Sequence, residues 1–224
     1  VRRPYSGRPT FFFFFQTSLQ TVLSGFLLAS LFAIPAGVLI GLSPLCYSAA
    51  NPLIQLLKPI SPLAWLPLIT IVVSASYPAD GLLSRSYLVS ALTVALCSLW
   101  PTLINTIVGV SQVPADLQNV SKVLRLNWFR HVRAIVLPSA VPMIFTGLRL
   151  SLGIAWMVLI AAEMLAQNPG LGKFVWDEFQ NGSSDSLARI CVAVAVIGLI
   201  GLLLDRLMLS LQKAVSWDKS VQLR

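Results

Sequence analysis

The sequence predicts an all-α membrane protein, a polytopic bundle of about five transmembrane helices. Of its 224 residues, 56% are hydrophobic and only 11% are charged, and the mean hydropathy is +0.81. Soluble domains carry about 25% charged residues, so this chain has too few polar groups to cover a water-facing surface. The second observation is that five stretches approach the about 20 apolar residues that a helix needs to cross a bilayer.

The first two predicted spans differ in continuity. Residues 17–42 are apolar on all sides of a helix, with only short polar side chains between them. Residues 52–75 are interrupted by Pro59, Pro62 and Pro67. Proline removes a backbone donor and kinks or breaks a helix, and a bilayer tolerates this where protein or a water-filled cavity satisfies the freed carbonyls. We therefore expect the second span to face protein or a pathway.

Three further spans complete the bundle. Residues 87–110 form the third and contain Pro101, and residues 135–166 form the fourth, which is long enough to include an entry turn. Residues 187–211 form the fifth.

The ends of the chain differ from this transmembrane domain, which we place at residues 17–212. Residues 1–16 form an N-terminal segment in which Phe11–Phe15 is too short to span and too apolar for open water. It could be the remnant of a further span or a segment lying at the interface. Residues 213–224 are predicted to be a cytoplasmic tail.

The distribution of charge predicts the orientation. The basic loop of residues 111–134 carries four Lys or Arg and one acid, whereas residues 167–186 carry one Lys and three acids. Since cytoplasmic loops are rich in Lys and Arg, we place the basic loop and the C-terminus in the cytoplasm. The net charge of +8 lies between apolar runs rather than on one stripe, so no nucleic-acid partner is predicted. The three cysteines form no CxxC pair, and we expect no metal site.

The basic loop contains the most informative pattern. Pro114 and Asp116 are typical of a helix start, and Leu117, Val120 and Leu124 then recur at helical spacing. These features predict a short amphipathic helix of about three turns, followed by a second short helix over residues 128–136. Two interpretations are open: the helix docks into a groove on a soluble partner, or it lies on lipid headgroups.

Residues 114–138 resemble the cytoplasmic loop of binding-protein-dependent ABC importer permeases. The family pattern is Glu-Ala-Ala, three residues, Gly, nine residues, Ile, one residue and Leu-Pro. Ile135, Leu137 and Pro138 match its end. The sequence departs from the pattern at the positions of Glu-Ala-Ala and Gly, which are occupied here by Asn119, Val120 and Ser121 and by Arg125.

Seven further stretches are similar to the nitrate, sulfonate and taurine permeases, and the resemblance covers about residues 17–212. Two of them look specifically like the nitrate/nitrite branch: residues 99–106 (LWPTLINT) and 168–182 (NPGLGKFVWDEFQNG). The others are residues 63–67 (LAWLP), 120–126 (VSKVLRL), 145–150 (FTGLRL), 153–158 (GIAWMV) and 161–165 (AAEML).

The resemblance implies a type I ABC importer permease fold in the bacterial inner membrane. Two permease copies, forming a homodimer, would line the pathway, two cytoplasmic ATPase subunits would each hold one basic loop, and an extracytoplasmic nitrate-binding protein would deliver the anion. The chain has no GxxxxGK[ST] phosphate loop, so we expect no catalytic residues and no cofactor here, with ATP and Mg²⁺ on the ATPases. The apolar anchors would be Leu117, Val120, Leu124 and Trp128, and Lys122 and Arg125 could pair with acids on the ATPase.

Three charged residues in or near the predicted spans are candidates for the translocation pathway: Lys58, Arg149 and Glu163. Charges inside a membrane are costly and mark pathways or paired contacts. For Arg149 the alternatives are a cavity-facing cation that attracts an anion, a side chain that snorkels to the interface, and a partner of a neighbouring helix. For Glu163 we expect a structural or gating hydrogen-bonding group.

The sequence leaves alternatives for other polar residues and for the function. We expect His131 to be a solvated loop histidine. Residues 176–178 could contact the extracytoplasmic binding protein or form an interfacial aromatic belt with solvated acids. The transported species could be another small anion: a sulfonate, taurine, bicarbonate or cyanate. A stand-alone secondary transporter is the alternative class, although the spans hold few of the charges that such carriers use.

Overall fold

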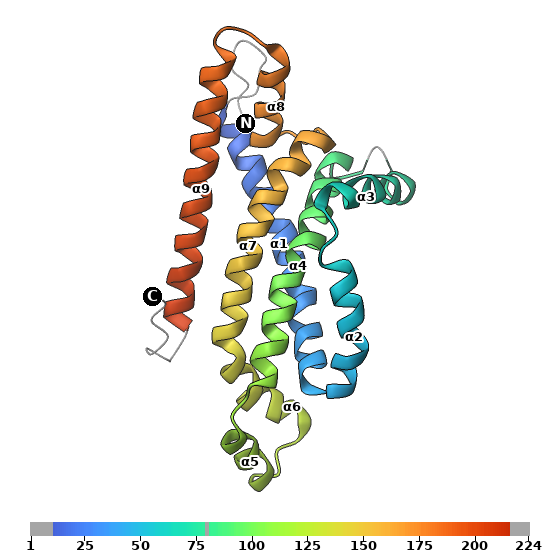
Figure 1. Ribbon diagram of the computed structural model, residues 1–224, viewed down its shortest axis with the longest axis vertical. Helices are drawn as coiled ribbons and strands as arrows, with labels where there is room; N and C mark the ends of the chain where they lie inside the picture. Colours follow the sequence, from blue (N-terminus) through green and yellow to red (C-terminus); the bar gives the residue numbers. More distant parts are fainter. Residues whose placement is uncertain (1–10, 79–80, 216–224) are drawn as a thin grey trace. The chain divides into compact units, whose positions relative to one another are not determined.

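All regular elements that the structure describes are helices (Figure 1). This computed structural model describes residues 11–78 and 81–215, and no strand occurs in these two ranges. The predicted all-α class is confirmed. In chain order the elements are α1 (Phe11–Leu42), α2 (Pro44–Leu57), α3 (Pro62–Ser76), α4 (Arg85–Ser111), α5 (Ala115–Val123), α6 (Trp128–His131), the π helix η1 (Val132–Val136), α7 (Leu137–Ala166), α8 (Leu171–Asn181) and α9 (Ser186–Val215).

Four of the described helical runs are long and apolar enough to cross a membrane: α1, α4, the run from α6 through α7, and α9. The pair α2 and α3 adds a fifth span if the two helices are counted together. The prediction of about five spans is therefore confirmed.

The second predicted span consists of two helices rather than one. Helices α2 and α3 contain 14 and 15 residues, which gives each a length of about 21–23 Å at 1.5 Å per residue, shorter than a bilayer core of about 30 Å. Ser43 and Ser61 cap their N-termini, and each cap is followed by a proline at the first helical position. The break falls between Leu57 and Pro62, as the prolines predict, whereas Pro67 lies inside α3 without ending it.

Helix α1 begins six residues earlier than the predicted start of the first span. Its first turns contain the Phe11–Phe15 run, which we had assigned to a separate N-terminal segment. The reason is packing: the rings of Phe11 and Phe14 lie 5.5 and 5.8 Å from the ring of Phe174 in α8. The rest of the predicted N-terminal segment, residues 1–10, lies outside the described residues, as do residues 216–224 of the predicted tail.

The chain divides into two compact units, and each long helix contributes residues to both. The α8 unit comprises the described residues within 11–29, 59–98 and 152–204. The α5 unit comprises residues 30–58, 99–151 and 205–215.

Helices α1 and α4 approach closely within each unit because glycine occupies the contact. In the α8 unit, a Cβ at Gly25 would lie 2.7 Å from the carbonyl oxygen of Ala91. In the α5 unit, a Cβ at Gly37 would lie 2.6 Å from the Cβ of Thr106. Small residues that admit a second backbone are typical of helix pairs in membranes.

Each unit also has its own buried apolar clusters. In the α8 unit, Ile69 and Val73 of α3 pack with Val89 of α4. In the α5 unit, Ile54 of α2 packs with a cluster from α1 and α4. Each half of the broken span thus packs one side against protein, whereas most of its side chains are exposed.

Candidate functional site

Helix α5 begins where the sequence predicts. Pro114 occupies the N-cap position, Asp116 lies in the first turn, and Lys122 lies in the last. An acid near the N-terminus and a base near the C-terminus both interact favourably with the helix dipole. These charges favour a short helix that has few other sources of stability.

The end of α5 is a Schellman motif with an unusual residue in it. The amide of Leu126 donates to the carbonyl of Ser121, and that of Arg125 donates to Lys122, both at 3.1 Å. Arg125 has a φ of 45°, in the left-handed region that glycine adopts most readily. This conformation explains why the position that Arg125 occupies is usually Gly in the resembling family.

A side-chain hydrogen bond joins α5 to α6. The Ser121 hydroxyl and the Nδ1 atom of His131 lie 2.7 Å apart, and Ser121 is buried. Our expectation that His131 is a solvated histidine was therefore wrong, because the chain turns back at Asn127, which caps α6. This bond fixes the two short helices relative to each other.

Large apolar side chains of this helical pair are exposed. Val123 is 81% exposed, Leu124 62% and Trp128 59%. We call the whole set the α5–α6 surface: Leu117, Val120, Val123, Leu124, Trp128 and Phe129. The four exposed cations of the basic loop lie among these residues: Lys122, Arg125, Arg130 and Arg133. An exposed apolar patch rimmed by polar groups marks an interaction site.

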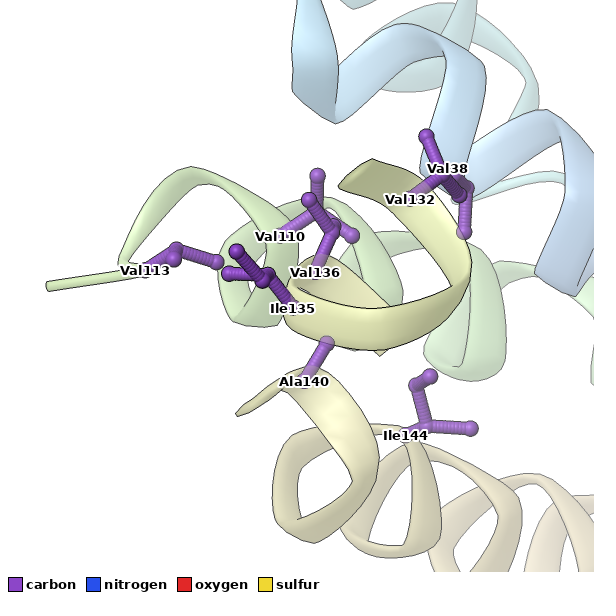
Figure 2. Close-up of a cluster of buried hydrophobic side chains, with 8 residues drawn as sticks. All are labelled: Val38, Val110, Val113, Val132, Ile135, Val136, Ala140 and Ile144. Atoms are coloured by element: carbon purple, nitrogen blue, oxygen red, sulfur yellow. The ribbon is translucent and has the colours of Figure 1, made fainter. Parts of the chain in front are cut away.

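A buried cluster anchors the base of this pair in the α5 unit (Figure 2). Val132, Ile135 and Val136 of η1 pack against residues of α1, of α4 and of the segment that follows α4. Figure 2 shows Val132 beside Val38, with Ile135 and Val136 directed towards Val110 and Val113. The cluster continues into α7 through Ala140 and Ile144.

The predicted loop residues therefore fall into two groups. Ser121 and Ile135 are buried and hold the loop together, and Leu137 packs partly against the same cluster. The remaining predicted residues lie on the exposed side: Leu117, Asn119, Val120, Lys122, Leu124, Arg125, Trp128 and Pro138.

Glu163 lies in a closed hydrogen-bond cluster in the α8 unit. Its side chain is fully buried, and its carboxylate accepts hydrogen bonds from the Ser18 hydroxyl at 2.7 Å and from the Gly172 amide at 2.9 Å. The Ser18 oxygen in turn accepts from the Leu171 amide at 2.9 Å. We call this set the Glu163 clasp. It joins α1, α7 and the N-terminus of α8, where the helix dipole favours a negative charge.

Two glycines make room for the clasp. A Cβ at Gly170 would lie 2.2 Å from the carboxyl group of Glu163, and a Cβ at Gly172 would lie 2.3 Å from the carbonyl oxygen of Ile160. The sequence Asn-Pro-Gly-Leu-Gly at residues 168–172 is thus fitted to a buried carboxylate.

Arg149 is paired with an acid of a neighbouring helix in the α5 unit. Its guanidinium donates to both carboxylate oxygens of Asp205 in α9, at 2.6 and 3.0 Å. Of the three alternatives, the structure shows the helix-to-helix pair. Gln212, two turns further along α9, donates to Thr146 of α7 at 3.3 Å. The two contacts join the same faces of α7 and α9 because seven residues are about two helical turns.

Two other predicted positions have simpler surroundings. Lys58 is exposed at the end of α2, and its ammonium group lies 3.4 Å from the side-chain oxygen of Gln55. Glu178 is buried and contacts Ser186 at 3.1 Å and Arg189 at 3.3 Å. Of the two alternatives for residues 176–178, a solvated acid is therefore excluded at Glu178, because α8 is bonded to the start of α9 there.

Comparison with known families identifies the family of the chain. Residues 32–217 match the family described as the binding-protein-dependent transport system inner membrane component. The chain belongs to this family.

The chain is also similar to curated permeases whose names include an anion. It is 38% identical to the nitrate import permease protein NrtB of Leptolyngbya laminosa over 190 residues, 85% of this chain and 63% of that protein. It is 40% identical to the bicarbonate transport system permease protein CmpB of Synechocystis sp. over 206 residues, 91% and 69% of the two chains. The chain spans about two thirds of the length of these relatives.

The predicted fold is also confirmed. A chain of the MetNI methionine ABC transporter, solved in inward-facing conformations, superposes with a TM-score of 0.75 over 89% of this chain and 93% of that one, at 13% identity. The type I ABC importer permease fold that the resemblance implied is therefore present.

Sequence reasoning missed several side chains that bond to the predicted site residues. It singled out Arg149 and Glu163 but not Asp205 or Ser18, which lie 56 and 145 positions away from them along the chain. A serine in an apolar helix carries no signal of its own. Asp205, an acid inside the fifth predicted span, was a signal that could have been used.

Proposed function

We propose that this chain is the permease subunit of an ATP-driven, binding-protein-dependent importer of nitrate or a chemically similar small anion. The observation that carries the proposal is the α5–α6 surface, an exposed apolar and basic face on a loop between two membrane-spanning helices. Membership of the family supports it independently.

The partner that fits this surface is an ATPase subunit with an apolar groove and an acidic rim. Amphipathic helices dock into hydrophobic grooves through anchors at helical spacing, and Leu117, Val120 and Leu124 have that spacing. The neighbouring cations would steer the encounter and fix its register more than they would add affinity. ATP and Mg²⁺ would be bound by that subunit.

The complete importer would contain two permease copies, two ATPases and an extracytoplasmic anion-binding protein. The basic loop and the C-terminus would face the cytoplasm, as the Lys and Arg distribution predicts. ATP-driven closure of the ATPases would move the basic loops, and α7 would transmit that movement to the pathway as a rigid-body change.

The transported anion would be chosen largely outside this chain. Arg149 is already held by two hydrogen bonds to Asp205, and all the contacts of Glu163 described above come from its own chain. Relatives named for nitrate and for bicarbonate share similar identity with the chain. We favour nitrate because residues 99–106 and 168–182 resemble the nitrate branch, and bicarbonate is the alternative.

Photocrosslinking tests the docking partner. A photoreactive amino acid at Leu124 should form an adduct with the ATPase in membranes that contain the complete importer. The matched control is Leu199 in α9, an apolar residue of similar exposure in a membrane-spanning helix, which should label lipid. The proposal fails if Leu124 also labels only lipid.

Uptake assays test the substrate. A strain that lacks its own nitrate importer should recover nitrate uptake when it receives this permease with its cognate ATPases and binding protein. Uptake of bicarbonate but not of nitrate would move the assignment to the alternative anion, and uptake without any ATPase would exclude an ATP-driven importer.

A further inference from the structure

The helix that leaves the basic loop contains a π turn. In η1, the amide of Leu137 donates to the carbonyl of Val132, five residues earlier instead of four. Single π turns inside α-helices are uncommon and occur frequently at functional sites. This one lies in the α5 unit, between the α5–α6 surface and α7.

Pro138 explains why the turn lies here. Proline has no amide hydrogen, and its ring collides with the carbonyl of the residue four positions earlier in an α-helix. In an uninterrupted helix from α6 through α7, Pro138 would be the eleventh residue and its ring would meet the carbonyl of Ala134. Ala134 lies within η1, where the turn is wider.

The π turn changes the direction in which the preceding residues point. One additional residue in a turn rotates the upstream segment by about 100° relative to α7, the angle per residue of an α-helix. His131 is five residues before Val136, so in an uninterrupted α-helix its side chain would point about 140° away from that of Val136. The wider turn reduces this angle, so His131, with Ser121 bonded to it, points in a different direction from the one an uninterrupted helix would give, while Val136 stays in the buried cluster.

The loop follows this rotation as one piece. The Ser121–His131 hydrogen bond ties α5 to α6, and the Schellman motif at Leu126 fixes the connection between them. The orientation of α6 about the axis of α7 therefore decides where the α5–α6 surface points.

We propose that Pro138, through the π turn η1, sets the rotational register in which the α5–α6 surface is presented relative to α7. Pro138 is a positioning residue for coupling: it is exposed and belongs to no part of the apolar surface. Only the expected effect on coupling to the ATPase rests on the proposed function, because the register itself is a property of this chain.

A disulfide assay reports the register without any partner. Cys46, Cys97 and Cys191 are first replaced by Ala, and Val132→Cys in η1 and Val38→Cys in α1 are then introduced, at two positions that lie side by side in the buried cluster (Figure 2). Oxidation should join them when Pro138 is present. Pro138→Ala should abolish the crosslink because the turn can close to an α-helix and rotate the loop.

A deletion provides the matched rescue. Ala134 is exposed and lies inside η1, so deleting it removes one residue from the wide turn. In the Pro138→Ala background this deletion gives an α-helix in which Leu137 still bonds to Val132, which keeps the original register. The crosslink should return. Pro142→Ala, which removes a proline inside α7, is the control and should leave the crosslink unchanged.

The same variants without the engineered cysteines test the consequence in the complete importer. Transport per ATP hydrolysed should fall about tenfold with Pro138→Ala, within the range for changes that disturb coupling between sites, and the Ala134 deletion should restore it. The variants should reach the membrane and retain the ATPases, as quantified by copurification.

Three outcomes would overturn the inference: an undiminished crosslink in Pro138→Ala, a deletion that restores neither readout, or a lost crosslink with unchanged coupling. If the deletion variant does not fold, Pro138→Ala in the disulfide assay still decides the question. Failure of the proposed function would look different, since Leu124 would then label no ATPase in the wild-type chain while the disulfide result would stand.

Discussion

Glu163 shows how a single charged residue is accommodated in an apolar helix. Its carboxylate accepts hydrogen bonds from the Ser18 hydroxyl in α1 and from a backbone amide at the start of α8. The Ser18 oxygen accepts a hydrogen bond from a second amide of α8. A buried charge without such donors would be costly. These contacts make Glu163 a hydrogen-bonding group within the α8 unit, and whether it also has the gating role that the sequence left open stays a prediction.

Replacing Ser18 by Ala removes a single hydroxyl group, and we expect it to destabilise the α8 unit. The substitution removes a donor to Glu163 and an acceptor for the Leu171 amide, and leaving buried polar groups unpaired costs about 1–3 kcal/mol. Thermal unfolding of the purified chain in detergent measures the effect. Thr70→Ala is the control, since the Thr70 hydroxyl is exposed and bonds only within α3. Equal melting temperatures for the two variants would contradict the clasp.

The Arg149–Asp205 pair should show strong non-additivity. Arg149→Leu or Asp205→Leu alone leaves one charge unpaired between apolar helices, and an unpaired charge at the centre of a membrane helix costs about 2.5–3.5 kcal/mol. Partial exposure of both side chains will lower this cost. The double variant should therefore be more stable than either single one. Additive losses in the same unfolding assay would show that the pair contributes no coupling energy.

At the scale of the element, the basic loop is a preformed structure. Its capped helices, internal hydrogen bond and buried base are in place before any partner binds, so docking would require little additional ordering. Preorganisation of this kind reduces the entropy cost of association.

A charge placed on the α5–α6 surface should uncouple the permease. Leu124→Asp should weaken ATPase binding by about 2 kcal/mol or more, as expected for a central apolar anchor, and should abolish nitrate uptake while the chain stays in the membrane. Gln112→Asp is the matched control, because it adds the same charge to an exposed polar position of the same loop outside the α5–α6 surface. Copurification with the ATPase and uptake in whole cells measure both steps. Normal uptake with Leu124→Asp would remove the docking claim.

The elements differ in how well the sequence predicts them. The long spans and α5 were found because apolar periodicity and terminal charges are local signals. The start of α1 at Phe11 was missed because packing on Phe174, which is distant in the sequence, decides it. The π turn was missed because Pro138 indicates a perturbed helix without showing which turn widens. The Glu163 clasp depends on tertiary contacts that no short window contains.

At the scale of the whole molecule, the charge distribution makes a prediction about sidedness. In a variant without the three natural cysteines, Lys122→Cys should react with a membrane-impermeant maleimide only after the cells are opened. Asp185→Cys, in the segment between α8 and α9, should react in intact cells. Both positions are exposed, so a difference reports the side of the membrane. Labelling of both from the same side would contradict the orientation assigned by the positive-inside rule.

The Glu163 clasp also has a consequence for how the chain is made. Ser18 precedes Glu163 by 145 positions and Leu171 by 153. A ribosome that adds 5–20 residues per second needs about 7–30 s to synthesise the intervening 145 residues. During that interval the nascent α1 holds a serine hydroxyl whose carboxylate partner does not yet exist. A chain released before residue 171 would therefore lack the hydrogen bond that joins α1 to the start of α8.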